Sequence, residues 1–356
     1  MKKRYLIVAA FAMMFILIVC MVSSWKEVEN KQTASEKTTE SSIEKKNLQI
    51  GVSFDSFILE RWQRDRDVLV STANELGADV NVQNANGSLA EQVDEIEYFI
   101  EQQVDVIILV MVTSSEDTSE LRSVIKKAQN ASIPVIAYDR LVLDAGVDYY
   151  ISFDNEEVGR LMAQHMKEHL GGSGTILQIC GPTADNNVAQ VMTGFSKELE
   201  GSDLTVTETD YAEGWMGEMG FQYTSSYLAA NKAPSGIMCG NDSIAGNTIR
   251  SLSENRLAGS VCVVGQDADL DACQRIVEGT QCMTVYKPVE KLAQRAAELA
   301  VDLAGGVKPA AEDTINDGSY DVPYEKLSPI AVTKDNMDEE ITGIYHEEDD
   351  IYLNVR

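Results

Sequence analysis

The chain is short of the residue types from which many catalytic and nucleic-acid-binding sites are built. Its 356 residues hold 29 lysines and arginines against 57 aspartates and glutamates, so the formal net charge is −28. Such a charge repels phosphate backbones and argues against a nucleic acid partner. The sequence also contains no G-x-S-x-G elbow, P-loop or dinucleotide-binding fingerprint, which argues against the enzyme classes that carry these motifs.

Cysteine is present but does not occur in motifs. None of the six cysteines belongs to a C-x-x-C pair, so the sequence suggests neither a zinc site nor a disulfide framework. Four of them fall within strand-like runs, where a free cysteine behaves as a small buried apolar residue; they are Cys180, Cys239, Cys262 and Cys282. From this pattern we expect no metal site and no cofactor.

Histidine occurs three times, and two of the three fit a metal-binding motif. Residues 165–169, "HMKEH", match H-x-x-E-H, and His165 and His169 are four apart on a predicted helix. However, His165 lies on the apolar stripe of that helix, and His169 directly precedes its expected C-terminus, where a cation is favourable. We therefore interpret both as ordinary helix residues and keep a zinc hydrolase as a distant alternative.

The N-terminus has the pattern of an export signal. Three basic residues precede Tyr5–Val22, which carries no charge and is just long enough to span a bilayer at about 20 residues. The positive-inside rule then places the rest of the chain outside the cytoplasm. "LIVC" at 17–20 resembles a lipoprotein signal with Cys20 as the lipidated residue. We expect residues 1–23 to be a signal, lipoprotein or membrane-anchor segment that tethers the chain.

The next segment, residues 24–47, is polar and lacks apolar periodicity. Such a composition is typical of a flexible stalk. At the other end of the chain, residues 342–356 are rich in acidic groups, and we interpret them as a solvated tail.

From Leu48 onward, short apolar runs alternate with stretches of helical periodicity, which predicts βαβ units. The ten strand-like runs are Leu48–Phe54, Asp79–Gln83, Val104–Val112, Ile133–Asp139, Tyr149–Phe153, Thr175–Cys180, Leu204–Thr209, Gly236–Cys239, Val261–Gly265 and Cys282–Tyr286. Ten strands exceed one comfortable open sheet. We therefore predict an α/β protein with two doubly wound parallel-sheet lobes joined by a hinge.

We expect the chain to cross between the lobes within residues 141–148, because this segment separates two strands without a helical pattern. The first lobe then comprises residues 48–142 and 288–318. The second comprises residues 143–287 and 319–341.

Polar and aromatic residues follow seven of the predicted strands, at the ends where doubly wound sheets bind ligands. The residues that we select are Arg61, Trp62, Asp139, Arg140, Asp185, Asn187, Trp215, Asn241, Asp267 and Lys287. Carboxylate, amide and guanidinium groups hold vicinal hydroxyls with paired hydrogen bonds, and indole rings stack on the C–H faces of a sugar. The inventory therefore fits a carbohydrate. For any single residue the alternative is a solvated loop or a helix N-cap, as for Asp154, Asn155 and Asp185.

The motifs around these residues resemble one family. "LERWQRDRD", "IAYDRL", "YISFDNEEVG", "DNNVAQ", "EGWMGE", "GNDSIAG", "GQDADL" and "TVYKP" are similar to segments of the sugar-binding proteins of bacterial ABC importers, and most closely of D-xylose-binding proteins. The resemblance covers about residues 48–341. It implies a type I periplasmic-binding-protein fold, in which two lobes joined by three hinge strands close over one sugar.

The resemblance also implies roles for the selected residues. Trp62 and Trp215 would sandwich the sugar ring, while the charged groups and amides would take its hydroxyls. The protein would deliver its sugar to an ABC permease. The alternative is a tethered xylose sensor that signals to a membrane histidine kinase. We expect no enzyme activity, although paired carboxylates such as Asp267 and Asp269 leave a glycoside hydrolase as a distant alternative.

Overall fold

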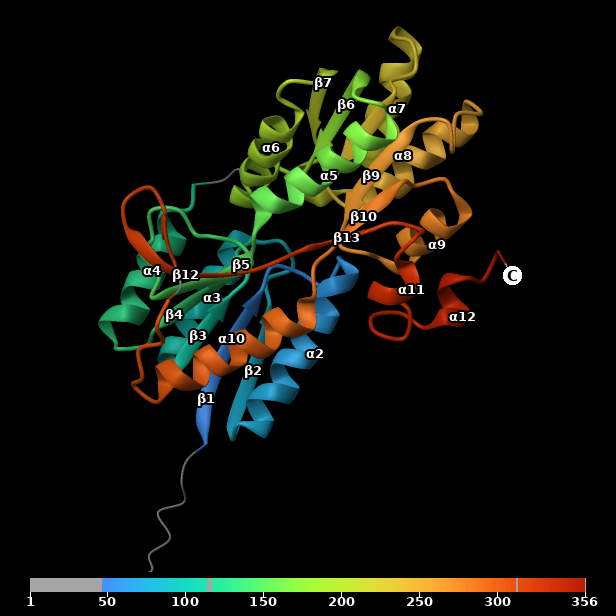
Figure 1. Cartoon of the computed structure of the whole chain (residues 1–356). Helices are drawn as coiled ribbons and strands as arrows, with labels where there is room; N and C mark the ends of the chain where they lie inside the picture. Colours follow the sequence, from blue (N-terminus) through green and yellow to red (C-terminus); the bar gives the residue numbers. More distant parts are fainter. Residues whose placement is uncertain (1–46, 114–116, 312, 356) are drawn as a thin grey trace, which may run out of the picture. The chain divides into compact units, whose positions relative to one another are not determined.

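The computed structural model describes residues 47–113, 117–311 and 313–355. The expected signal or anchor segment with Cys20, and all but the last residue of the expected stalk, lie outside these ranges. Within them, no helix is both long and apolar enough to cross a membrane. From Leu48 onward the chain forms one unit, in which two α/β lobes are visible (Figure 1).

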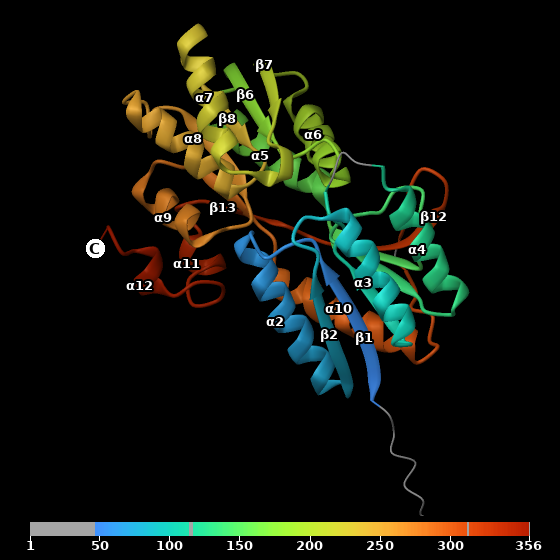
Figure 2. The ribbon, with the colours of Figure 1, turned by 180° about the vertical axis from the view of Figure 1, so that it is seen from behind.

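The first lobe is built on a seven-stranded sheet in the order β11-β12-β5-β4-β3-β1-β2. Its strands are β1 (Leu48–Phe54), β2 (Ala78–Asn84), β3 (Val106–Leu109), β4 (Val135–Tyr138), β5 (Tyr149–Phe153), β11 (Asp313–Asn316) and β12 (Asp321–Leu327). Its helices are α2 (Glu60–Glu75), α3 (Leu89–Glu101), α4 (Ser119–Asn130) and α10 (Val289–Ala304). In β3, Val106 and Ile108 share a core with α2 and α10, whereas Ile107 and Leu109 share one with α3 and α4. The uniformly apolar strand is thus buried on both faces, with helices on either side (Figure 2).

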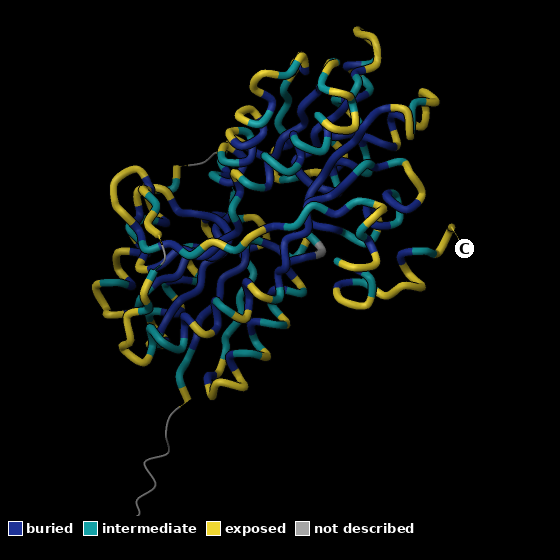
Figure 3. The backbone as a smooth tube through the Cα atoms, in the orientation of Figure 1, coloured by how far each residue is buried: buried dark blue, intermediate teal, exposed yellow. Residues whose placement is uncertain are grey.

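The second lobe is built on a six-stranded sheet in the order β13-β10-β9-β8-β6-β7. Its strands are β6 (Ser173–Cys180), β7 (Asp203–Tyr211), β8 (Gly236–Cys239), β9 (Cys262–Gln266), β10 (Met283–Tyr286) and β13 (Ile330–Val332). The accompanying helices are α5 (Asn155–His169), α6 (Asn186–Leu199), the short η1 (Glu213–Trp215), α7 (Glu218–Ala230), α8 (Asp242–Glu254) and α9 (Leu270–Glu278). Met238 of β8 packs with α5 and α6, and its neighbour Ile237 packs with α7 and α8. Figure 3 shows the buried interior of both sheets and the more exposed helices around them.

The chain passes from one lobe to the other three times. It leaves the first sheet after β5, returns to it after β10, and passes between the sheets again from β12 to β13. These three passes agree with the three hinge strands that the family resemblance implies. The two-lobed α/β architecture predicted from the sequence is confirmed.

The first crossing lies one strand later than the predicted segment, residues 141–148. Tyr149–Phe153 pairs in parallel with β4, so it belongs to the first sheet, as does Asp321–Leu327. The connection before β5 contains no helix, yet it returns to the start of β4, where the Asp148 N–H donates to the carbonyl of Val135. Buried residues of this loop, such as Leu141 and Val142, cover the sheet as a helix would. The sequence prediction placed the crossing in residues 141–148 because this segment has no helical pattern. The chain instead stays in the first lobe until the end of β5.

The sheets are mixed rather than wholly parallel. β11 runs antiparallel to β12, and β13 runs antiparallel to β10, each at the edge of its sheet. These strands were not predicted: β13 spans three residues, and β11 is largely exposed. Apolar periodicity gives little signal in such strands, because β13 is too short to show a repeat and most side chains of β11 are exposed.

The acidic tail is not simply solvated. Tyr345 and Ile351 are buried within the core that joins α2, α9 and α10. Arg64 of the first lobe donates to the carbonyl of Tyr345, and Gln274 of the second donates to that of Asp350. The tail includes the short helix α12 (Glu348–Ile351) and follows α11 (Met337–Glu340), and both lie beside α9 in Figure 1. The acidic groups of the tail are exposed, and a few buried apolar residues anchor the tail to the core.

Two glycines let α5 and α6 approach at backbone distance. A Cβ atom at Gly194 would lie 1.8 Å from the carbonyl oxygen of Glu156, and one at Gly159 would lie 1.9 Å from that of Val191. Neither carbonyl can move without shifting its helix. This contact fixes the position of α6, whose first turn carries two of the residues selected above.

We expect Gly194→Ala to lower the free energy of unfolding by about 2 kcal/mol or more, because the added methyl group must push the two helices apart. Gly246→Ala in α8 is the control, since its Cβ would meet the far end of the flexible Arg275 side chain. Urea denaturation of both variants checks this. Equal stability losses in the two variants would contradict the close contact.

A buried carboxylate shapes the loop that follows β9. Asp242, at the start of α8, is 1% exposed and accepts hydrogen bonds from the Asp269 N–H, the Thr284 hydroxyl and the Gln281 amide. The Thr284 hydroxyl in turn accepts from the Ala268 N–H. Burial raises the pKa of Asp242 to about 7, despite the nearby Arg275. The carboxyl group that holds this loop in place therefore ionises at a higher pH than an ordinary aspartate does.

This raised pKa predicts a pH dependence of stability. A carboxyl group with a raised pKa in the folded state contributes stability below its unfolded pKa of about 4, and loses that contribution as the pH rises through its folded pKa. Between about pH 4 and 7, the wild type should therefore lose stability relative to Asp242→Asn, by about 1.4 kcal/mol per pH unit at most. Denaturant unfolding at several pH values checks this, with the exposed Asp271→Asn as control. A constant difference between wild type and Asp242→Asn would contradict it.

Candidate functional site

One cavity between the two lobes is lined by all ten residues selected from the sequence. They are Arg61, Trp62, Asp139, Arg140, Asp185, Asn187, Trp215, Asn241, Asp267 and Lys287. Every one except Trp215 is buried, with at most 9% of its surface exposed. The cavity lies at the carboxyl ends of strands from both sheets, because β4, β8, β9 and β10 all end beside it. The structure thus brings together residues that lie more than 200 positions apart in the chain.

Arg61 lies at the centre of a group of carboxylates. Its guanidinium donates to Asp139 at 3.1 Å, lies 3.5 Å from Asp65 one turn along α2, and lies 3.9 Å from Asp267 of the second lobe. Burial alone would raise the pKa of Asp139, but Arg61 and Lys287 outweigh it and hold the pKa below its usual value. Asp139 is therefore an ionised acceptor at the cavity wall.

Asp65 is a supporting residue that the sequence reasoning missed. It is fully buried, and it accepts a hydrogen bond from the Tyr138 hydroxyl as well as contacting Arg61. Burial raises its pKa to about 6, although Arg61 opposes the shift. The spacing of four residues between Arg61 and Asp65 on a predicted helix was the available signal.

Trp62 lies at the first turn of α2 and is 1% exposed. The guanidinium carbon of Arg61 lies 4.3 Å from the centre of its ring system, and that of Arg140 lies 5.3 Å away. These cations are attracted by the indole π-system. Within the described part of the chain, the buried Nε1 of Trp62 has no hydrogen-bond partner. A buried donor of this kind is expected to meet an acceptor from a ligand or water.

Arg140 joins the two lobes. Its guanidinium donates to Asp55 and to the carbonyl of Met111 in the first lobe, and its Nε lies 3.1 Å from Asp185 in the second. A second link is formed by Asn187, whose amide donates to the carbonyl of Asp139 at 3.0 Å. Since Asp185 and Asn187 lie at the start of α6, these bonds hold the second lobe against the end of β4.

Trp215 is fixed in place by close contact with two glycines. Its Nε1 donates to Asp185 at 3.2 Å. Its six-membered ring lies where a Cβ at Gly181 would come within 2.3 Å of it, and Gly240 borders it from the next strand. The indole therefore lies flat over the ends of β6 and β8 and presents its remaining surface to the cavity.

Asp267 and Lys287 come from neighbouring strands. Asp267 directly follows β9 in a left-handed backbone conformation, with φ of 102°, and its N–H donates to the carbonyl of Val285 in β10. Its carboxylate pairs with Lys287 at 2.7 Å. Gln266 beside it also lines the cavity, and among the described residues its buried Oε1 has no hydrogen-bond partner.

Asn241 and Asp185 combine two roles. Each caps the helix that follows it, since Asn241 accepts from the Ile244 N–H and Asp185 from the Asn187 N–H. Capping, the alternative weighed above for such residues, is correct for both, and also for Asp154, which caps α5. Capping and facing the cavity are compatible, because the side-chain NH2 group of Asn241 is left for the cavity, while the second oxygen of Asp185 accepts from Trp215 and lies beside Arg140 at the cavity wall.

Three further residues line the cavity but were not selected from the sequence: Leu59, Asn155 and Gln266. Asn155 is buried, and its amide donates to Asn187 at 3.0 Å. It was considered only as a cap, because it follows a strand at the start of a helix. In the sequence, Gln266 follows a predicted strand and could have been selected. Nothing in the sequence marks the apolar Leu59 as a cavity residue.

A larger hollow lies elsewhere, between α5, α6 and the strands β11 and β12 at one side of the first sheet. The cations on its wall already have carboxylate partners: Arg160 pairs with Glu157, Lys197 with Glu156 and Lys326 with Asp154. These pairs are partly exposed and weak. We therefore take the smaller, buried cavity as the candidate functional site.

Comparison with known proteins identifies the family. Residues 50–308 match the family model described as a periplasmic binding protein domain. The D-xylose-binding periplasmic protein of Escherichia coli is 39% identical to this chain, over 86% of this chain and 93% of the relative. That of Haemophilus influenzae is 40% identical, over 88% of this chain and 94% of the relative.

Solved structures agree. An ABC transporter solute-binding protein of Clostridium phytofermentans with bound β-D-glucose is 26% identical, with a TM-score of 0.75 over 85% of this chain and 99% of that one. A carbohydrate transporter solute-binding protein of Chloroflexus aurantiacus in complex with D-glucose is also 26% identical, with a TM-score of 0.77 over 85% of this chain and 98% of that one. With its two hinged α/β lobes and a polar cavity between them, this chain belongs to the periplasmic binding protein family.

Proposed function

We propose that this protein binds one monosaccharide, D-xylose, in the cavity between its lobes and delivers it to an ABC permease outside the cytoplasm. The observation that carries the proposal is the convergence of two tryptophans, three cations and three carboxylates on one buried cavity. The names of two relatives that are 39% and 40% identical to this chain supply the sugar.

The chemistry of the cavity suits a neutral polyol. Among the residues that line the cavity, three cations (Arg61, Arg140 and Lys287) pair with three carboxylates (Asp139, Asp185 and Asp267), so an uncharged ligand leaves these pairs undisturbed. The paired groups still have free lone pairs and N–H groups, which can bond to hydroxyls that both donate and accept. Trp62 and Trp215 would stack on the apolar faces of the sugar ring.

The same pairing makes hydrolysis a poor fit. A glycoside hydrolase needs one carboxyl group that stays protonated as an acid beside a second, ionised one. Asp139 and Asp267 each lie beside a cation, and the pKa of Asp139 is lowered. Such groups favour retention of a sugar over its protonation and cleavage.

Lobe closure would couple binding to delivery. The cross-lobe bonds, Arg140 to Asp185 and Asn187 to the Asp139 carbonyl, exist only when the lobes are together. A sugar that contacts both lobes favours this closed arrangement by its extra contacts there. The permease would recognise the closed surface.

Isothermal titration calorimetry of variants tests the assignment of the site. Trp62→Ala should weaken D-xylose binding by about 1–3 kcal/mol through lost stacking. Asp267→Asn should cost a similar amount, because it removes an acceptor and leaves Lys287 without its partner in a desolvated cavity. Asp271→Asn, on the exposed face of α9, is the matched control and should bind as the wild type does. Unchanged affinity in both cavity variants would contradict the site.

A thermal-shift screen of monosaccharides tests the ligand. A ligand that binds only the folded state raises the melting temperature by an amount that grows with the logarithm of its concentration relative to its dissociation constant. We expect D-xylose to give the largest shift, ahead of D-glucose, D-ribose and L-arabinose at equal concentration. A larger shift with another sugar would show that the protein binds sugars but that D-xylose is not its preferred ligand. No shift with any sugar would overturn the proposed function.

A further inference from the structure

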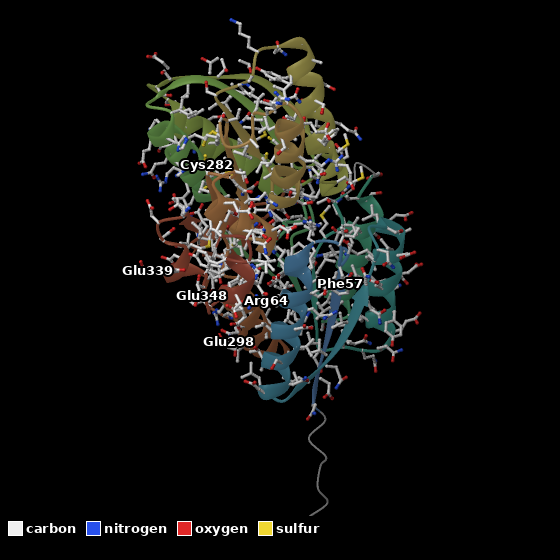
Figure 4. All side chains as sticks on the ribbon, turned by 90° about the vertical axis from the view of Figure 1, so that its right-hand side faces the viewer. Phe57, Arg64, Cys282, Glu298, Glu339 and Glu348 are labelled. Carbon is white, nitrogen blue, oxygen red and sulfur yellow. The ribbon has the colours of Figure 1, made fainter. Side chains whose placement is uncertain are left out.

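A second cluster of reactive side chains lies in the second lobe, away from the sugar cavity. It consists of His165 and His169 of α5, Cys262 at the start of β9, and Cys282 just before β10. One ligand atom from each residue, an imidazole nitrogen or a sulfur, lies within 4.8 Å of every other. Figure 4 labels Cys282 in the second lobe, apart from Arg64 and Phe57 of the first.

The fold explains why the four residues meet. His165 and His169 are four residues apart, so they lie on the same face of α5, and their rings stack 5.9 Å apart. β9 and β10 are parallel neighbours, so the residues at their starts lie side by side at one edge of the sheet. The His169 Nε2 lies 3.9 Å from the sulfur of Cys282.

The cluster has unmet bonding capacity. Within the described residues, the Nε2 of His165 is buried and has no hydrogen-bond partner. An orphaned buried polar atom is costly, so it is expected to have a partner outside the protein atoms. Cys262 is 2% exposed, and its sulfur is one of the four ligand atoms that lie within 4.8 Å of one another.

We propose that His165, His169, Cys262 and Cys282 bind one zinc ion in tetrahedral coordination. Two thiolates and two imidazoles form the Cys2His2 set of structural zinc sites. Zinc bonds of about 2.3 Å to sulfur and 2.0–2.1 Å to nitrogen place ligand atoms roughly 3.3–3.8 Å apart. Since all four ligand atoms lie within 4.8 Å of one another, each pair would have to approach by at most about 1.5 Å, which small side-chain rotations supply.

The position of the site indicates a structural role. It lies at the amino ends of β9 and β10, while Asp267 and Lys287 follow the carboxyl ends of the same strands. Four protein ligands leave no open position for substrate. The ion would therefore tie α5 to two strands and stabilise the second lobe without touching the sugar. This inference is independent of the proposed sugar.

The motif H-x-x-E-H thus points to a site, but not to the hydrolase with which it is associated. Its glutamate, Glu168, is not one of the four ligands. The two remaining ligands come from cysteines about 100 residues further along the chain.

Cobalt substitution tests the proposal on the full chain, reduced and freed of metal by a chelator. We expect one Co²⁺ per chain, with the intense visible absorption of tetrahedral thiolate coordination, and its displacement by an equimolar amount of Zn²⁺. Zn²⁺ should also raise the melting temperature. His169→Gln, at an exposed position, and Cys282→Ser should each weaken zinc binding about tenfold or more and abolish the zinc-dependent shift. His346→Gln, which changes the remaining histidine, should leave both unchanged.

Three results would overturn the proposal. The first is a weak octahedral cobalt spectrum, or no stoichiometric binding. The second is zinc affinity in His169→Gln and Cys282→Ser equal to that of the wild type. The third is a Cys262–Cys282 disulfide, detected by thiol counting and mass spectrometry, that forms in air as readily with equimolar zinc present as without it. D-xylose titration of the same samples separates this test from the proposed function, since sugar affinity should not depend on zinc.

Discussion

The structure around the cavity depends on the burial of Arg61 among carboxylates from both lobes. A guanidinium that is 3% exposed can be kept there only if its charge is neutralised and its donors are satisfied. Asp65 does this from the same helix, Asp139 from the end of β4, and Asp267 from the second lobe. The same arrangement lowers the pKa of Asp139 and places a cation over Trp62. One buried charge therefore sets the ionisation of the cavity wall, the orientation of its aromatic group and part of the contact between the lobes.

Much of this arrangement could be predicted from the sequence, because parallel strands of a sheet end at a common edge. Asp139 and Asp267 were found because each lies at the end of an apolar run or within two residues of it, and Trp62 because it begins the helix after the first strand. All ten predicted strands exist, most of them with ends shifted by one to three residues. The residues that were missed are those whose role depends on packing. Asn155 of the second lobe resembles a helix-start residue, and Leu59 of the first is an ordinary apolar residue, until the two lobes are placed together.

Three features could not be predicted, each for a physical reason. The loop before β5 covers the sheet with Leu141 and Val142 instead of a helix, so helical periodicity gave the wrong crossing point. The C-terminal segment is acidic on its outer surface, but Tyr345 and Ile351 hold it against the core. The cluster of His165, His169, Cys262 and Cys282 has two ligands that are separated from the others by about 100 residues, and only the pairing of β9 with β10 and the packing of α5 bring them together.

A crystal structure of the protein grown with D-xylose tests the central claim most directly, because it shows which side chains contact the sugar. We expect one pyranose ring between the lobes, with its C–H faces against the indoles of Trp62 and Trp215 and its hydroxyls bonded to Asp139 and Asp267. Electron density for the sugar at any other place, or a ring in this cavity that touches neither tryptophan, would contradict the account.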